Sequence, residues 1–420
     1  LAGPVYASEI KSLRTQPSFP QASKKGITLE DPSTINVALD LGATNTVINM
    51  DMCDLILANE DENGNPIDNS QRSDVIEFEC NGEIFYFNAN YVQAQDSMIA
   101  AYSRNGMNVT MVLIAWAKTH TNKYPSPLLY LDAKENRQTM AFNTSTQRGR
   151  EYWIAAMEFL GNRYSRSTCL VDKFIINNEI DYTYDWSLLQ PNKDSNGKYQ
   201  RVEINTFMEE FARSLRLANL AVKKYNSEAK VLVSLTHNWA MNCYDSYRNT
   251  GNTIRYNSYA PRDILDWLLK YEKARGDYDW GLAVHPYPIG TTSSKPTVTD
   301  PAWSGTGSNP YPIDGTLDTP WITAANLEVY QLYLEQPKAL YNGELRTVSI
   351  TEAAICNIDP SKNSAAAYQR AISEQAASVA QYYYRAACIE CIDQIAYFQP
   401  FSKRLIFLQV RIIIVAFSVQ

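Results

Sequence analysis

The feature that most constrains this chain is a repeated alternation of short apolar runs with longer helical patterns. Eight runs have the near-continuous apolar character of buried strands: residues 25–29, 46–50, 109–116, 174–176, 230–235, 281–284, 347–350 and 392–397. Helical patterns follow seven of them, and residues 403–420 could supply the eighth helix. Such alternation predicts parallel strands joined by right-handed crossovers. Eight repeats favour an α/β fold closed into a (β/α)8 TIM barrel.

The main alternative is an open, doubly wound sheet. Sheets of that kind often carry a Gly-rich phosphate loop directly after an early strand, and no early strand of this sequence is followed by one. We therefore expect one barrel over residues 25–400, with an N-terminal extension at 1–24 and an atypical tail at 401–420. Leu1 in place of an initiator methionine indicates a fragment or a processed chain.

Insertions are expected at four places in this barrel. Residues 75–87 alternate apolar and polar side chains around Asn81-Gly82, a strong signal for a two-residue hairpin after strand 2. Long loops are predicted after strands 4, 5 and 6, at 181–203, 238–260 and 289–320. Connections of this length in a compact domain are usually functional.

Charge and composition exclude several classes of protein. A net charge of −7 leaves no basic field for nucleic acid. The strongest apolar stretch, 405–417, is shorter than the roughly 20 residues of a membrane-spanning helix. Seven scattered cysteines, an odd number, favour free thiols over a disulfide framework. The unusual content is 28 Tyr and 8 Trp, typical of a surface that stacks on flat, uncharged ligands.

Two glutamates close apolar runs and are the candidate catalytic residues. Glu179 ends FIINNE and Glu352 follows TVSIT, so both are expected at the carboxyl ends of barrel strands, where burial makes a carboxylate costly without a partner or a task. Two carboxylates across a barrel mouth suit retaining glycoside hydrolysis by double displacement. We expect His285 and Tyr287 to hold Glu352 ionised as the nucleophile, and Glu179 to have a raised pKa as the acid/base. Asp181, two positions later, is interpreted as a solvated loop residue.

These motifs carry a family resemblance. Asn178-Glu179 on the fourth strand, His285-Pro-Tyr287 on the sixth and Glu352 in ITEA on the seventh resemble the clan A retaining glycoside hydrolases, which are TIM barrels. More narrowly, the chain looks like a bacterial domain family of that superfamily whose activity is unsettled. The resemblance implies that Asn178 binds the hydroxyl next to the anomeric carbon, that Tyr287 orients the nucleophile and that His285 lines the site.

The sequence departs from the clan pattern at two strand tips. Many members carry an Arg near the end of strand two, where this chain has Asn49 and Asp51. Many also carry a Trp platform at the end of strand eight, where this chain has Tyr397 followed by Phe398. We expect Tyr397 to serve as the platform here.

Further substrate-binding residues are predicted at strand tips and on the long loops: His237, Trp239, Trp186 and Trp303. A zinc site made of His237, His285 and Glu179 is a weaker alternative, because metal-dependent barrels commonly carry an HxH pair on strand one. Another is a barrel that binds carbohydrate without catalysis. No cofactor is predicted, the partner is an oligosaccharide or polysaccharide, and the substrate class favours a secreted, periplasmic or cell-surface bacterial enzyme.

Overall fold

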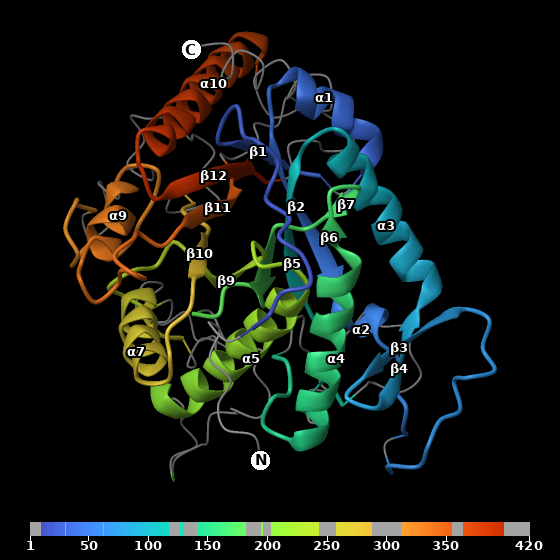
Figure 1. Cartoon of the computed structure of the whole chain (residues 1–420). Coiled ribbons are helices and arrows are strands. Elements are labelled where there is room, and N and C mark those ends of the chain that lie inside the picture. The colour runs from blue at the N-terminus through green and yellow to red at the C-terminus, as the bar shows by residue number, and fades with distance from the viewer. Residues whose placement is uncertain are drawn as a thin grey trace.

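The barrel predicted from the sequence is confirmed. The computed structural model describes residues 10–29, 31–61, 63–116, 127–129, 141–181, 195, 203–242, 258–287, 313–354 and 364–398 (Figure 1). Eight parallel strands close into a barrel in the order β1-β2-β5-β8-β9-β10-β11-β12. Their bounds are β1 (Lys25–Thr28), β2 (Asn45–Asp51), β5 (Asn108–Ile114), β8 (Lys173–Ile176), β9 (Lys230–Leu235), β10 (Trp280–Val284), β11 (Val348–Ala353) and β12 (Ile392–Tyr397).

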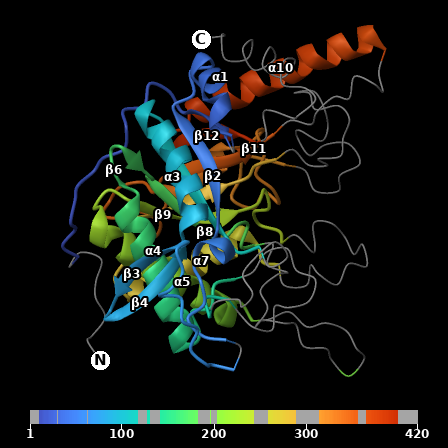
Figure 2. The same cartoon turned by 90° about the vertical axis from the view of Figure 1, so that its right-hand side faces the viewer.

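Helices surround the barrel, and the two views show them covering its outside (Figures 1 and 2). Their bounds are η2 (Pro32–Thr34), α1 (Ile35–Asp40), α2 (Met52–Leu55), α3 (Ala89–Arg104), α4 (Gln147–Arg163), α5 (Ile204–Tyr225), α7 (Pro261–Ala274), α9 (Glu328–Leu334) and α10 (Ala365–Ala387). On α5 the apolar residues recur every three or four positions and lie buried against the strands, as on an amphipathic helix: Phe207, Phe211, Leu215, Ala218 and Val222.

The hairpin lies in the chain between β2 and β5, outside the barrel sheet. β3 (Val75–Cys80) and β4 (Glu83–Asn88) pair antiparallel, and Asn81 and Gly82 turn the chain with φ of 53° and 83°. Two positive φ values are what a type I′ turn requires, and Asn-Gly meets them at low steric cost. Phe87 stacks on Phe159 of α4 with the ring centroids 3.8 Å apart, so the hairpin is packed onto the helix layer.

A second short hairpin was not predicted. β6 (Ser165–Arg166) and β7 (Cys169–Leu170) pair antiparallel just before β8. Both strands are too short for an alternating pattern to reveal them in the sequence.

The N-terminal extension packs at the end of the barrel where the strands begin. The backbone N–H of Leu13 donates to Lys224 O, and Gln16 N donates to the side chain of Asn226 at the end of α5. Phe19 N donates to Asn108, the first residue of β5. The tail at 401–420 lies outside the described residues. Within the ranges given above, no helix is both long and apolar enough to cross a membrane.

The barrel interior is a separate apolar layer inside the larger core that the strands share with the helices. It consists of small and branched side chains from alternate positions of the strands: Val47, Val112, Ile114, Ile175, Leu232, Ala283 and Ala396. Side chains two positions further along each strand point the same way. Ala283 is therefore followed by His285 on the interior side, above the apolar layer.

A register shift between β11 and β12 directs the side chain of Glu352 toward the barrel axis at the carboxyl ends of the strands. Along β11 the pairing with β12 passes from Ile350↔Ile395 to Ala353↔Tyr397, so three steps on β11 match two on β12. One extra residue in a strand is a β-bulge, which commonly redirects a side chain beside an active site. Thr351 points inward to His285, and the bulge lets its neighbour Glu352 do so as well.

A substitution at Gly281 tests how tightly the barrel interior is packed. A Cβ on this residue of β10 would lie 2.7 Å from Leu232 Cδ2 and 2.9 Å from the backbone oxygen of Thr347. Because backbone cannot move away cheaply, we predict that Gly281→Ala lowers the free energy of unfolding by about 1–3 kcal/mol in urea titrations. The matched control is Gly315→Ala, where the nearest atom is 3.7 Å away. Equal stability of the two variants would contradict this packing.

Candidate active site

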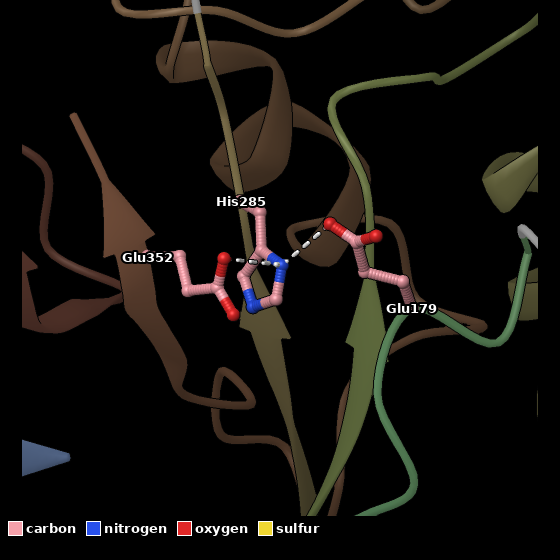
Figure 3. Close-up of side chains that lie close together, drawn as sticks. All are labelled: Glu179, His285 and Glu352. Atoms are coloured by element: carbon pink, nitrogen blue, oxygen red, sulfur yellow. Dashed lines mark hydrogen bonds and ion pairs between the residues drawn. The ribbon is translucent and has the colours of Figure 1, made fainter. Parts of the chain in front are cut away.

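Glu179, His285 and Glu352 meet at the carboxyl ends of the strands, with the imidazole between the two carboxyl groups (Figure 3). His285 Nδ1 lies 2.8 Å from Glu179 Oε1 and 3.7 Å from Glu352 Oε2. One oxygen of each glutamate lies within 4.8 Å of the other. Glu179 follows β8 and Glu352 lies on β11, so barrel closure brings together residues from opposite halves of the chain.

The backbone around Glu179 is unusual and firmly held. Asn177 and Glu179 have positive φ, 61° and 47°, a region that non-glycine residues seldom occupy. Glu179 N donates to Ser234 Oγ at 2.9 Å, and Ile180 N donates to Ser234 O at 3.0 Å, which fixes this turn on β9. Such conformations persist where surrounding structure enforces them, often at functional sites.

Asp181 is buried beneath this turn, which corrects its interpretation as a solvated residue. It has 0% exposure and accepts hydrogen bonds from the backbone N–H of Thr236 at 2.8 Å and from its hydroxyl at 2.5 Å. Burial raises the pKa of Asp181 to about 7, against the lowering effect of the Thr236 bonds. No pattern in the sequence predicts this burial, since the turn that buries Asp181 depends on the positive φ values before it.

Glu352 and His285 have further partners. Tyr287 OH donates to Glu352 Oε2 at 2.9 Å, and His285 Nε2 lies 3.1 Å from Thr351 Oγ1. Tyr287 therefore contacts the carboxylate that was predicted for it. His285 was predicted to hold Glu352, but its short contact is with Glu179.

The electrostatics of the ligand-free site are the reverse of the prediction. For Glu179, burial raises the pKa, but the hydrogen bond and charge of His285 outweigh it and hold the pKa below its usual value. For Glu352, burial and then the nearby charge of Glu179 raise the pKa, despite His285 and Tyr287. Burial alone would lower the pKa of His285, but the two carboxylates raise it. Both shifts favour a charged Glu179 beside a protonated His285.

Asn178 and His237, also predicted to bind substrate, lie just beyond the ends of β8 and β9. Asn178 has a buried side-chain oxygen that accepts no hydrogen bond from the described residues. His237 is buried, and burial lowers its pKa to about 4, so its imidazole is neutral near Glu179. An unpaired buried acceptor is costly unless a ligand supplies a donor.

Two predicted aromatic residues are core residues. Trp239 is 1% exposed, donates its indole N–H to Leu317 O and packs edge-on against Tyr330 and Tyr333. Tyr397 is 6% exposed and belongs to the core between barrel and helices. Both rings lie in the core, and their predicted contacts with substrate stay predictions. Trp186 and Trp303 lie outside the described residues.

The ligand set that could hold a metal ion also differs from the predicted one. Within the part of the chain that the structure describes, Glu179, His285 and Glu352 form a possible group, without His237. Glu179 and His285 are joined by a hydrogen bond of 2.8 Å, which accounts for their closeness without an ion.

The sequence of the chain matches one known protein family. A model described as "Family of unknown function (DUF5722)" matches residues 17–404. The chain belongs to this family. None of the curated proteins matches the sequence of this DUF5722 chain.

Solved structures similar to the DUF5722 chain include glycoside hydrolases, the superfamily that its sequence resembles. A hyperthermophilic β-glucosidase from Pyrococcus furiosus is 14% identical over 87% of this chain and 74% of that chain, with a TM-score of 0.47. A family 39 glycoside hydrolase from Bacteroides cellulosilyticus WH2 is 14% identical over 90% and 56%, with a TM-score of 0.46. Fungal β-1,4-galactanases are 12% identical over 95% and 100%, also at 0.46. None of these scores is high enough to transfer a function.

The buried Asp181 gives a pH dependence of stability with a defined sign. Its pKa rises from an ordinary 3.8 to about 7 on folding, so the folded state holds the proton more tightly. The stability it contributes is complete below pH 3.8 and is lost as the pH rises through about 7. We predict that wild type loses stability relative to Asp181→Asn between about pH 5 and about pH 8 in urea unfolding. A wild-type-to-variant difference that is constant over this range would contradict the burial of a protonated Asp181.

Proposed function

We propose that the chain is a retaining glycoside hydrolase that cleaves a β-linked glycan, with Glu352 as nucleophile and Glu179 as acid/base. The observation that carries this proposal is the separation of the two carboxyl groups, whose nearest oxygens lie within 4.8 Å at a barrel mouth. Retaining enzymes place this pair about 5–5.5 Å apart, whereas inverting enzymes leave about 6.5–9.5 Å for a water. The unpaired oxygen of Asn178 beside Glu179 supports a ligand rich in hydroxyl donors.

The reaction needs two displacements at the anomeric carbon. In the first, Glu352 forms a bond to that carbon while the glycosidic C–O bond breaks and Glu179 gives a proton to the leaving oxygen. In the second, Glu179 takes a proton from water, the water oxygen bonds to the anomeric carbon, and Glu352 leaves as a carboxylate. Tyr287 stabilises that carboxylate at both ends of the cycle through its hydrogen bond of 2.9 Å.

In this proposal, the imidazole of His285 supplies the proton. His285 Nδ1 donates to Glu179 Oε1 across 2.8 Å. A bound sugar removes water from the mouth, and a drier site disfavours charged forms. The proton then moves from His285 to Glu179, which leaves a neutral acid and a neutral imidazole. Glu179 then carries the proton that the leaving oxygen needs, while the hydrogen bond from Tyr287 favours the carboxylate form of Glu352.

Activity measurements on conservative variants test this assignment. Against a panel of aryl β-glycosides and β-linked oligosaccharides, Glu179→Gln is predicted to lower kcat by about 10²–10⁴-fold, since a general acid contributes that much. Glu352→Gln is predicted to reduce turnover below detection. The matched control is Glu344→Gln, because Glu344 is an exposed glutamate ahead of β11. Binding of the panel by wild type without hydrolysis would instead favour a carbohydrate-binding barrel.

Azide assigns the two roles separately. In Glu179→Ala, azide is expected to attack the glycosyl–enzyme and to give a β-glycosyl azide with retained configuration. In Glu352→Ala, azide takes the place of the nucleophile and gives the α-glycosyl azide. Proton NMR of the products distinguishes the two. The opposite pattern of products would show that the glutamates have exchanged roles.

A further inference from the structure

Trp116 follows β5 at the carboxyl end of the barrel strands, two residues after Ile114. Ile114 belongs to the interior layer and Ala115 to the outer core. Side chains alternate along an extended chain, so Trp116 again lies on the interior side, above Ile114. Its side chain is 42% exposed.

This exposure sets Trp116 apart from other tryptophans of the chain. Among the described residues, Trp153, Trp239, Trp280 and Trp321 are buried, and Trp267 is partly buried. Indole combines a large apolar face with a polar N–H, which suits ligands that have one apolar face and several hydroxyls. A tryptophan left exposed at a barrel mouth is therefore placed to meet a sugar ring.

The backbone of Trp116 is anchored to the neighbouring strand. Its N–H donates to Asp51 Oδ1 at 3.3 Å, and the same oxygen accepts from Cys53 N at 3.0 Å. Asp51 is the last residue of β2 and pairs with Ile114 in the register of the barrel. This hydrogen bond joins the chain just after β5 to the end of β2 and fixes the backbone position of Trp116.

The strand order places Trp116 opposite the proposed nucleophile. In the ring of eight strands, β5 stands four places from β11, which carries Glu352, and directly beside β8, which leads to Glu179. The interior of an eight-stranded barrel is only wide enough for side chains to fill. A single sugar ring held over the axis therefore reaches Glu352 on one side and an aromatic residue of β5 on the other.

We propose that Trp116 is the stacking platform for the sugar ring that binds between Glu179 and Glu352. This inference rests on the proposed function and narrows its substrate class to pyranosides with a continuous apolar C–H face, such as gluco- or galacto-configured rings. Trp116 takes the part that was predicted for Tyr397, whose ring is in the core. Furanosides lack a flat face of this size and are expected to be poor substrates.

The test compares Trp116→Ala with Trp116→Phe on aryl β-glucopyranosides and β-galactopyranosides. We expect the alanine variant to lose about tenfold or more in kcat/KM and the phenylalanine variant to keep most of it, because a second flat ring preserves stacking. Asp51 bonds to the backbone of residue 116, so that bond survives both substitutions. The control Trp267→Ala removes a partly buried tryptophan from the outside of α7 and should stay within about twofold.

The possible failures are distinguishable. If wild type hydrolyses pyranosides and Trp116→Ala equals it, the platform is wrong while the proposed function stands. An equal loss in the alanine and phenylalanine variants also overturns stacking. Hydrolysis of arabinofuranosides in preference to pyranosides overturns the substrate class. If wild type neither binds nor hydrolyses any aryl glycoside, both the platform and the proposed function fall.

Discussion

The hydrogen bond between His285 and Glu179 determines which charges the barrel mouth can hold. Two carboxylates with oxygens within 4.8 Å repel each other in a partly buried site. A protonated imidazole between them, 2.8 Å from one and 3.7 Å from the other, offsets that repulsion. In the proposed mechanism, the same imidazole is also the source of the proton that Glu179 delivers as the general acid.

The barrel and its two glutamates could be predicted because they depend on patterns that are local in the sequence. Each strand is a short apolar run, and closure follows from eight repeats of strand and helix. A glutamate at the end of such a run must lie at the mouth. Which carboxylate His285 would contact could not be predicted, since that depends on the turn at Asn177 and Glu179 and on the bulge before Ala353. Neither feature follows from apolar periodicity.

The alternation of side chains along the strands bears on the aromatic residues at two strand ends. Tyr397 follows Ala396, an interior residue of β12, so its ring points outward into the helix layer. The same rule places Trp116, two residues after Ile114, on the interior side. Trp239 is different, because its burial depends on Leu317 and two tyrosines around α9. Strand parity predicts the first two cases, whereas long-range packing decides the third.

The proposed mechanism requires a covalent glycosyl–enzyme intermediate, which can be trapped. A 2-deoxy-2-fluoro glycoside with an activated leaving group slows the second displacement more than the first, so the glycosyl–enzyme accumulates. Mass spectrometry of the intact chain and of its peptides is expected to find one fluorosugar attached to Glu352. A fluorosugar on Glu179, or turnover of the parent substrate to an inverted product with no covalent adduct, would contradict the account.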